Sequence, residues 1–274
     1  MNRPNLVFVF VDQLRLQSCG YAQDRYDRTY ADEPAPHTPN IDQLAGESAD
    51  FRQAVAGSPI CAPCRASLLT GKHTSSTGMV INELRAMPDP DAIGHVLSDN
   101  GYHTGYIGKW HLYGKDHSER QQFVPPGPYR LGFDQEWKAY NFNHKYYDGF
   151  YYEDTFDRID VPGYEPHTQT DLAIDYLKRR RASDDPFALF LSYGPPHDPW
   201  RWDNCPVNRS ITCPAMRRFR IPQATRTATP ATGTRNGTRS GGKKSGSRTG
   251  FGSVRFTLPR RRAWTGRWNG FSAR

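Results

Sequence analysis

Short apolar runs, separated by polar and turn-forming residues, mark out the first two hundred positions of the chain. Residues 5–11, after the polar Asn5, form a continuous apolar run, which is the pattern of a central parallel strand covered by helices on both faces. Further apolar runs predict strands at 51–55, 102–107 and 186–191. Together with the helix signals between them, these runs predict a globular α/β domain.

Three helices are predicted between these strands. The first, at 38–45, begins with a Thr-Pro pair that is typical of helix starts. The second, at 93–100, ends at Gly101, a residue that readily takes the left-handed conformation of a helix end. The third, at 171–181, has Thr170 as its expected cap and an apolar stripe along one face.

Charge is divided unevenly along the chain. The formal net charge is +8, but residues 201–274 hold 17 Lys and Arg against the single acid Asp203, whereas residues 1–200 hold 19 Lys and Arg against 27 Asp and Glu. Residues 225–252 have hardly an aliphatic side chain, so they cannot bury enough apolar surface to offset chain entropy. We therefore predict a folded domain at 1–200 and a basic, low-complexity, disordered tail at 201–274.

Two interpretations of the tail compete. Segments of Arg, Gly and Ser bind polyanions through charge and counterion release, which would make the tail a binding arm. The composition, however, changes abruptly after Trp200, in the middle of a motif where a domain should continue. This change favours a sequence translated out of frame or a truncated domain, and nucleic acid is not an expected partner.

Targeting signals and cysteine usage add little to the prediction of function. No stretch reaches the roughly 20 apolar residues of a membrane span, and no secretory signal precedes the strand at 5–11. The sequence as written therefore predicts a cytoplasmic protein with no membrane partner, or a periplasmic or secreted one if the true start lies upstream. Five cysteines at irregular spacing do not indicate a disulfide framework.

A Cys-Ala-Pro-Cys-Arg sequence carries the strongest chemical signal. Cys61 precedes a short helical run, so it gains from the amide dipoles at a helix N-terminus, and Arg65 adds a fixed positive charge. Such a pocket suits an anion. The pair of Cys61 and Cys64 also has the spacing of redox and zinc sites, which Cys205 and Cys213 could complete to four thiols.

Polar residues follow three of the predicted strands. Asp12 and Gln13 offer hard oxygen ligands suited to calcium or magnesium at the sheet edge where ligands bind. Lys109 and His111 are two apart, and in an extended chain such residues point to the same side. His197 lies in a loop bracketed by prolines, which restricts its backbone. Taken singly, each has an ordinary structural interpretation, such as a helix cap, a solvated lysine or a loop histidine.

A segment rich in Pro, Gly, Asn and aromatic residues spans 123–152. Loops of this composition commonly shape specificity in hydrolases. Locally packed surface loops have the same composition, so the sequence does not separate these two interpretations.

Five motifs in this chain resemble those of the type I sulfatases of the alkaline phosphatase superfamily. They occur in the order of that family and are the Asp-Gln pair at 12–13, T-P-N-I-D at 38–42, C-x-P-x-R at 61–65 followed by Thr-Gly, G-K-W-H at 108–111 and P-P-H-x-P at 195–199. The resemblance covers 5–200 and implies the fold of that family, in which helices flank a central, mostly parallel sheet.

The resemblance implies a nucleophile and a metal. A maturation enzyme would oxidise Cys61 to formylglycine, whose hydrate would attack the sulfur of a sulfate ester on a sulfated small molecule or saccharide. Asp12, Gln13 and the matured residue at 61 would bind Ca²⁺, or alternatively Mg²⁺. Arg65 would stabilise the nucleophile and the metal shell.

The other polar residues have implied roles in the same reaction. Lys109 would clamp the sulfate oxygens against developing charge. His111 would take the proton of the second hydroxyl, so that sulfate leaves by elimination. His197 would protonate or bind the bridging oxygen of the leaving group.

The chain departs from the family pattern beyond Trp200. Members of the family carry a second metal pair in a D-[HN]-G segment and a further lysine there; Asp203 is followed by Asn204 with no preceding apolar strand, and we do not count it as a ligand. Cys64 also stands where most members have Ser, Ala or Gly. The resemblance thus implies a C-terminally truncated sulfatase with impaired activity. A phosphonate monoester or phosphodiester hydrolase of the same superfamily is the alternative, and a non-enzymatic polyanion-binding fragment is the third.

Overall fold

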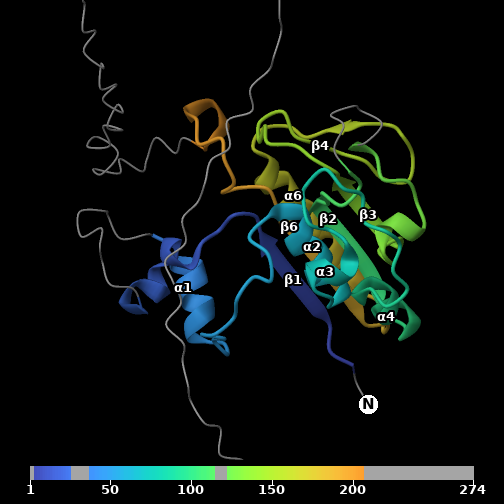
Figure 1. Cartoon of the computed structure of the whole chain (residues 1–274), viewed down its shortest axis with the longest axis horizontal. Coiled ribbons are helices and arrows are strands. Elements are labelled where there is room, and N and C mark those ends of the chain that lie inside the picture. Colours follow the sequence, from blue (N-terminus) through green and yellow to red (C-terminus); the bar gives the residue numbers. More distant parts are fainter. Residues whose placement is uncertain (1–2, 26–36, 115–121, 207–274) are drawn as a thin grey trace, which may run out of the picture. The chain divides into compact units, whose positions relative to one another are not determined.

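The computed structural model describes residues 3–25, 37–114 and 122–206, so the predicted tail beyond 206 lies outside the described residues. A parallel four-stranded sheet in the order β1-β6-β2-β3 runs through this part (Figure 1). Its strands are β1 (Leu6–Val11), β6 (Phe187–Tyr193), β2 (His103–Lys109) and β3 (Glu136–Tyr140). The predicted α/β fold with a mostly parallel sheet is confirmed.

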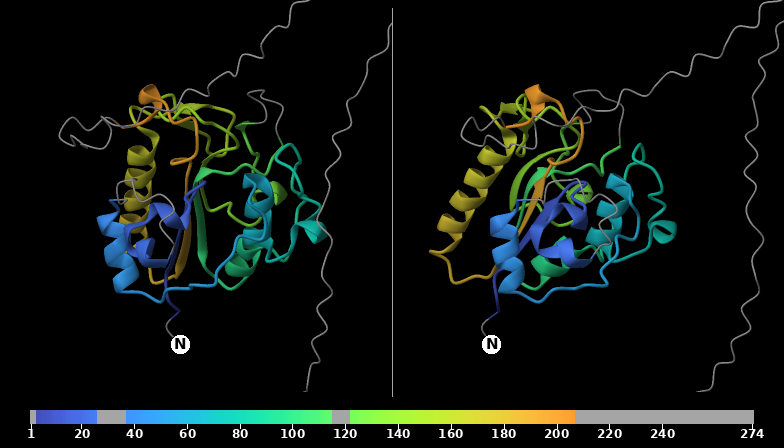
Figure 2. Two further views of the ribbon diagram at one scale, coloured as in Figure 1. Left: turned by 60° about the vertical axis from the view of Figure 1, so that its left-hand side comes forward. Right: turned by 90° about the vertical axis from the view of Figure 1, so that its left-hand side faces the viewer.

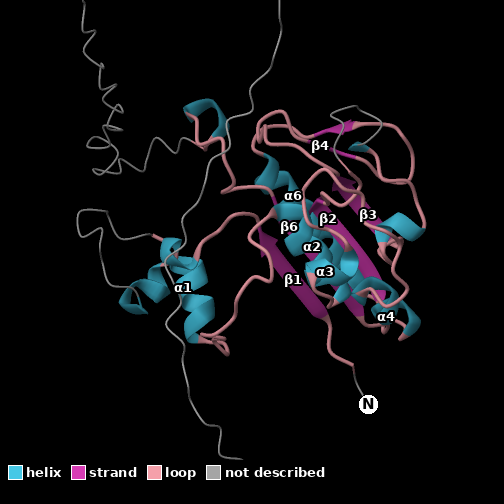
Figure 3. Cartoon of the chain, in the orientation of Figure 1, coloured by secondary structure: helices cyan, strands magenta, loops and turns pink. Residues whose placement is uncertain are grey.

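Helices cover both faces of the sheet, which is therefore the middle of three layers (Figure 2). One face carries α2 (Cys61–Thr70), α3 (Thr74–Thr77) and α4 (Ile93–Asp99), and the other carries α6 (Glu165–Arg180). The remaining elements are α1 (Pro39–Gly46), the antiparallel pair β4 (Phe150–Tyr151) and β5 (Ile159–Asp160), and 3-10 turns at Leu16–Ser18, Gly20–Arg25, Pro128–Arg130 and Trp202–Asn204 (Figure 3). None of the helices in the described ranges is long and apolar enough to cross a membrane.

Alternating side chains of the inner strands divide the core into two layers. Tyr106 of β2 packs with Ala66 and Leu69 of α2 on one face, whereas Ile107 packs with Ala173 and Tyr176 of α6 on the other. Successive side chains of a strand point to opposite faces, so one buried strand serves both layers. The site that follows therefore stands on a sheet held from both sides.

Strand register brings three loops to one edge of the sheet. Val11 of β1 lies opposite Tyr193 of β6, and Gly108 of β2 lies opposite Ser192 of the same strand. The residues after β1, β2 and β6 therefore leave the sheet side by side. This edge holds Asp12, Lys109 and the loop that carries His197.

The position of β1 differs from the prediction. Within the described ranges β1 pairs with β6 alone and lies at the edge of the sheet, with Val7 51% and Val9 52% exposed. An uninterrupted apolar run indicates a strand suited to burial on both faces, but it carries no information on which neighbours supply that burial.

Two other predicted elements need correction. No strand forms at 51–55, where Phe51 is 81% and Val55 89% exposed and the backbone makes turns instead. Helix α6 begins at Glu165, six residues before its predicted start, and Thr170 lies inside it with its hydroxyl donating to the carbonyl of Pro166 at 2.6 Å. Proline in the first turn and a buried glutamate, rather than threonine, mark the true start of this helix.

The other element predictions agree with the structure to within about two residues. Helix α4 ends near Gly101, whose φ is 75°, as the glycine predicts. The predicted strand at 102–107 is β2, which runs on to Lys109. The aromatic segment at 123–152 contains β3 and β4, which its composition did not predict.

Candidate active site

Asp12 is the centre of a buried charged cluster at the carboxyl edge of the sheet. It follows β1 directly, and its backbone N–H donates to the carbonyl of Tyr193 at the end of β6. This bond continues the parallel ladder by one step and fixes the direction of the Asp12 side chain. The carboxylate is buried and faces Cys61, Arg65 and Lys109.

Cys61 is the first residue of α2, and its Sγ lies 3.5 Å from Oδ1 of Asp12. Burial raises the pKa of this thiol, and the negative charge of Asp12 raises it further against the opposing charges of Lys109 and Arg65. The thiol is therefore protonated at neutral pH. The N–H of Ala62 behind it donates to Oδ1 of Asn82, which satisfies one of the free amides of the helix start.

Arg65 lies one turn into α2 and is almost completely buried. Its Nη1 donates to the carbonyl of Lys109 and to Oγ of Ser192, both at 2.7 Å, and its Nη2 lies 3.4 Å from Oδ2 of Asp12. The guanidinium therefore ties the ends of β2 and β6 to the start of α2. A buried cation with a carboxylate partner is costly to leave unpaired, so this arrangement is held firmly.

Lys109 ends β2 and has no exposed surface. Its Nζ lies 2.6 Å from Oδ2 of Asp12 and 3.1 Å from Nε2 of His144. Burial alone would favour the neutral acid at Asp12, but the charges of Arg65 and Lys109 hold the pKa of Asp12 well below its usual value. Asp12 is thus an anion between two cations.

His111 lies two residues beyond β2 and is buried. Its φ is 56°, so the chain is not extended here, and the alternation expected of an extended chain does not explain its position. Neither ring nitrogen has a hydrogen-bond partner among the described residues. Burial, together with the charges of Lys109 and Arg65, lowers the pKa of His111 to about 2. The imidazole is therefore neutral at pH 7, and the same surroundings make it a weak base.

The loop after β6 brings His197 to the cluster and contacts Gln13, which follows Asp12 after β1. Ligand atoms of Asp12, Cys61 and His197 all lie within 4.8 Å of one another, which is close enough for one ion. His197 Nδ1 also lies 2.9 Å from Oδ1 of Asp198. The side chain of Gln13 accepts from the N–H of Asp198 at 3.1 Å, so its oxygen is engaged on the loop.

The four-thiol alternative has no support in the described part of the chain. Cys61, Cys64 and Cys205 are free thiols, and the group that could hold an ion includes Cys61 but neither of the other two. Cys213 lies outside the described residues. The carboxylate of Asp12 is a hard oxygen donor, which suits a hard divalent cation better than a thiolate-bound metal.

Two site residues were not predicted from the sequence. His144 contacts Lys109, and its ring lies 4.1 Å from that of His197 between centroids. Ser192 is buried and accepts from Arg65. The position of Ser192 at the end of an apolar strand was a usable signal, whereas His144 stands in an irregular aromatic segment whose path the sequence does not define.

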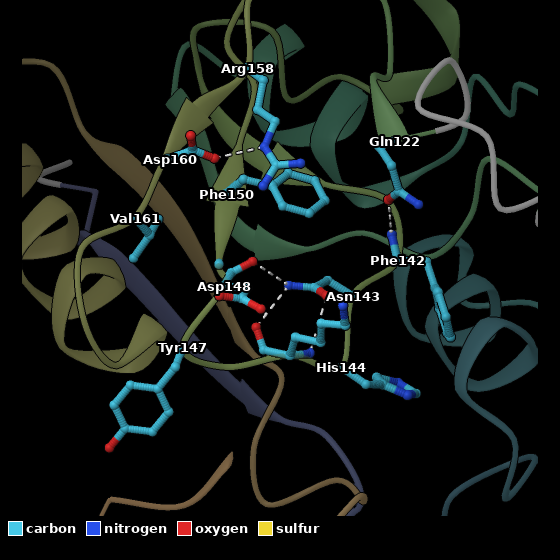
Figure 4. Close-up of a pocket in the computed structure, with 12 residues that line it drawn as sticks. Gln122, Phe142, Asn143, His144, Tyr147, Asp148, Phe150, Arg158, Asp160 and Val161 are labelled. Carbon is cyan, nitrogen blue, oxygen red and sulfur yellow. Dashed lines mark hydrogen bonds and ion pairs between the residues drawn. The ribbon is translucent and has the colours of Figure 1, made fainter. Parts of the chain in front are cut away.

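A pocket of about 820 Å³ opens beside His144 (Figure 4). It is bounded by the segment after β3 and by the β4–β5 pair, and its lining includes Asn143, Asp148, Phe150 and Arg158. His144 lines the pocket and also contacts Lys109, so the pocket and the charged cluster are neighbours.

Comparison with known proteins identifies the class of this site. The sulfatase family model matches residues 4–229, which is most of the chain, so the chain belongs to the sulfatase family. The match extends past the predicted domain boundary at Trp200, and the structure describes residues as far as Pro206.

Individual relatives agree with this assignment. An ulvan-active sulfatase of Formosa agariphila is 36% identical over 198 residues, covering 72% of this chain and 36% of the relative. An endo-4-O-sulfatase of Bacteroides thetaiotaomicron is 30% identical, with 72% and 44% covered. A solved protein in complex with its substrate D-glucosamine-2-N,6-O-disulfate gives a TM-score of 0.59 at 29% identity, covering 73% of this chain and 36% of that one. The chain thus spans less than half the length of these relatives.

Proposed function

We propose that the site hydrolyses sulfate esters through a formylglycine made from Cys61 and with the help of a divalent cation. The observation that carries this proposal is the contact of Cys61 with Asp12, while Arg65 and Lys109 stand buried beside the same carboxylate. Two buried cations at a helix start form a field suited to an anionic sulfate. Membership of the sulfatase family supports the same reaction.

The raised pKa of Cys61 fits a residue that is a precursor rather than a thiolate nucleophile. Once oxidised to formylglycine by a maturation enzyme, its hydrated aldehyde would supply the hydroxyl that attacks sulfur. Arg65 would stabilise that hydroxyl, and its position one turn from Cys61 in α2 supports this role. Lys109 would bind the sulfate oxygens and offset the negative charge that builds on them.

Proton transfers fall to the two histidines. His111 is neutral and both its ring nitrogens are free of partners within the described ranges, so it would be the acceptor for the proton of the second hydroxyl when sulfate leaves. Negative charge on the bound sulfate would offset part of the effect of Lys109 and Arg65, which lower the pKa of His111. His197, near Asp12 and Cys61, would protonate or bind the bridging oxygen of the departing alcohol. Acid and base would then stand on different loops of one site.

The cation would be held by Asp12 and Gln13 together with the oxygen of the matured residue 61, and it would supply positive charge against the sulfate. Asp12 is anionic and suits Ca²⁺, with Mg²⁺ as the alternative. Three residues supply these oxygen donors, whereas calcium prefers about six to eight oxygen ligands. We therefore expect weak cation binding and impaired turnover in this chain.

A sulfated saccharide is the proposed substrate. One relative is an ulvan-active sulfatase, and one solved neighbour is in complex with D-glucosamine-2-N,6-O-disulfate. The pocket of about 820 Å³ beside His144 has the size range of small-ligand sites.

The test is hydrolysis of 4-nitrophenyl sulfate by the full chain after co-expression with a formylglycine-generating enzyme. Mass spectrometry of the peptide that contains Cys61 would report the conversion of thiol to aldehyde. Cys61→Ala should abolish turnover, whereas Cys64→Ala, in the same helix, should retain it. Faster cleavage of an aryl phosphonate than of the aryl sulfate would favour the phosphonate hydrolase alternative instead.

Metal binding has a separate readout. Calorimetric titration of Ca²⁺ into the chain should give heat that Asp12→Asn removes, while Asp203→Asn, an exposed acid, should leave it unchanged. Equal binding by the chain and by Asp12→Asn would refute the metal site whatever the turnover. Polyanion binding by the tail concerns residues outside the described ranges and remains a separate question.

A further inference from the structure

The pocket beside the charged cluster has two chemically different ends (Figure 4). His144 lies at the end next to the cluster, where its Nε2 is 3.1 Å from Nζ of Lys109. Arg158 and Asp160 lie at the other end, on the segment that forms β5. A ligand whose sulfate is held by Lys109 would therefore extend along the pocket toward Arg158.

One edge of the Arg158 guanidinium pairs with Asp160, and one of its faces packs on the ring of Phe150. The other edge has no partner among the described residues. The Nε of Arg158 donates to Oδ1 of Asp160 at 2.7 Å, and the guanidinium lies 4.3 Å from the ring centroid of Phe150. Within the described ranges its two Nη groups have no hydrogen-bond partner, and the side chain is 41% exposed. A guanidinium fixed in this way presents two parallel N–H donors, which is the geometry that binds carboxylate or sulfate in a bidentate manner.

The wall of the pocket between these two ends is polar, and hydrogen bonds fix its loop. Oδ1 of Asn143 accepts from the N–H of Lys145 at 3.1 Å, and its Nδ2 donates to the carbonyls of Lys145 at 3.1 Å and Asp148 at 3.4 Å (Figure 4). These bonds hold the loop in one conformation, and Asp148 and Lys145 offer an acceptor and a donor to the pocket. Charged and amide groups along a fixed wall suit the hydroxyls of a sugar rather than an apolar ligand.

We propose that this pocket binds the saccharide part of the sulfate ester and that Arg158 binds an acidic group on a second sugar unit. The acidic group is an oxyanion, either a uronate carboxylate or a second sulfate. The inference rests on the proposed function, because His144 connects the pocket to the sulfate site. Arg158 is then a specificity-determining residue, and it takes no part in the chemistry at sulfur.

Calorimetry with three defined disaccharides tests this assignment. Each carries a 6-sulfated hexosamine, and the second sugar bears a carboxylate, a second sulfate or neither. The full chain, expressed without the maturation enzyme, should bind one or both acidic disaccharides about tenfold more tightly than the neutral one. The tighter of the two acidic ligands identifies the oxyanion.

Variants separate the role of Arg158 from a general charge effect. Arg158→Ala should remove the preference for the acidic ligand, and Arg158→Lys should retain only part of it, because lysine lacks the planar fork. Arg201→Ala is the matched control, since Arg201 is also exposed and also pairs with an aspartate two residues on, outside the pocket. Equal binding of all three disaccharides, or an undiminished preference in Arg158→Ala, would overturn the assignment.

Failure of this inference and failure of the proposed function give different results. Binding is measured without turnover, so an Arg158-dependent preference in a chain that does not cleave 4-nitrophenyl sulfate would leave the pocket assignment standing and refute the hydrolase. Cleavage of the aryl sulfate without any preference among the disaccharides would do the reverse. Thermal unfolding of each variant checks that a lost preference is not lost structure.

Discussion

Two buried carboxylates, Asp12 and Glu165, have surroundings that shift their pKa values in opposite directions. Asp12 has two cations beside it, Lys109 and Arg65. Glu165 at the start of α6 accepts hydrogen bonds from Tyr140 at 2.7 Å and from Gln169 at 2.8 Å, both neutral donors. Burial opposes ionisation of both acids, but only at Asp12 do nearby charges overcome it.

The comparison teaches that cationic partners, rather than burial or the number of hydrogen bonds, decide which acid is a permanent anion. Burial raises the pKa of Glu165 to about 7 despite its two hydrogen bonds, whereas the pKa of Asp12 falls below its ordinary value. Of these two acids, Asp12 is fully ionised at neutral pH, whereas Glu165 is partly protonated. Glu165 serves the packing of α6 against the loop that ends in Tyr146, whose carbonyl accepts from the Glu165 N–H.

The largest expected effect is that of Arg65→Ala on stability. Removing one partner of a buried ion pair leaves Asp12 less compensated and frees the carbonyl of Lys109 and the hydroxyl of Ser192. We expect the free energy of unfolding to fall by about 3–5 kcal/mol, measured by urea denaturation. Arg201→Ala, which breaks an exposed pair, should cost no more than about 0.5 kcal/mol. A loss in Arg65→Ala as small as that of the control would show that the cluster is not held by this cation.

The pH dependence of Glu165→Gln tests the other carboxylate. The folded-state pKa of about 7 lies above the ordinary value of 4.5, so the stability that protonated Glu165 contributes is present below about pH 4.5 and is lost as the pH rises through 7. Glutamine cannot ionise, so the chain should lose about 3 kcal/mol relative to Glu165→Gln between pH 4.5 and pH 8. The measurement is urea denaturation of both proteins across this range.

A control glutamate separates this effect from general titration. Glu47→Gln, at the exposed end of α1, should stay within about 0.5 kcal/mol of the unsubstituted chain. A constant difference between the chain and Glu165→Gln from pH 4.5 to pH 8 would contradict the raised pKa of Glu165.

The sequence predicts the positions of some of these site residues, namely those that lie at the ends of strands or at the start of a helix. Asp12 and His197 follow strands of a parallel sheet, and Lys109 ends one. The carboxyl ends of parallel strands share one edge, so the meeting of these residues was predictable from pattern alone. The helix start at Cys61 was predictable from its local sequence in the same way. The positions of these residues follow from short-range sequence signals and from one rule of sheet topology.

Other features depend on partners that no local pattern specifies. Burial raises the pKa of Glu165 against the hydrogen bonds of Tyr140 and Gln169, and only one of these two donors lies on its own helix. His144 reaches Lys109 through a loop whose conformation is set by Asn143 and by a residue sixty positions away, Asn204. Burial and loop conformation of this kind arise from tertiary packing, so the sequence alone does not predict them.

Lys109→Met tests how much Lys109 contributes to keeping Asp12 ionised. The pKa of Asp12 is depressed in the fold, so the stability from its ion pairs is present above the ordinary pKa and is lost as the pH falls below it. Arg65 remains after the substitution, so we expect a loss of about 2 kcal/mol at pH 7, less than for Arg65→Ala. The loss on acidification from pH 7 to pH 3 should also be smaller, as urea denaturation would report.

The control for this substitution is Lys178→Met, at an exposed position of α6. It should leave the acid dependence of stability unchanged. If Lys109→Met loses as much stability on acidification as the unsubstituted chain, then Lys109 does not hold the charge of Asp12, and Arg65 alone must do so.

The smallest expected effect concerns the loop that joins the two carboxylate regions. Its residue His144 contacts Lys109 beside Asp12, and its residue Tyr146 accepts from the backbone of Glu165. Asn204 holds this loop, because its Nδ2 donates to the carbonyl of His144 at 2.9 Å and its Oδ1 accepts from the N–H of Tyr146 at 2.6 Å. Asn204→Ala leaves that buried N–H without a partner, so local opening should become easier by about 1–2 kcal/mol.

Hydrogen exchange at the amide of Tyr146 measures this opening directly. Exchange should be about tenfold faster in Asn204→Ala, since about 1.4 kcal/mol corresponds to a factor of ten. Asn100→Ala is the control, because Asn100 makes a single exposed bond to the carbonyl of Val96. Unchanged protection of Tyr146 would mean that packing rather than Asn204 fixes the loop. Faster exchange that extends to the amide of Glu165 would mean that this one asparagine couples the anionic and the neutral carboxylate regions.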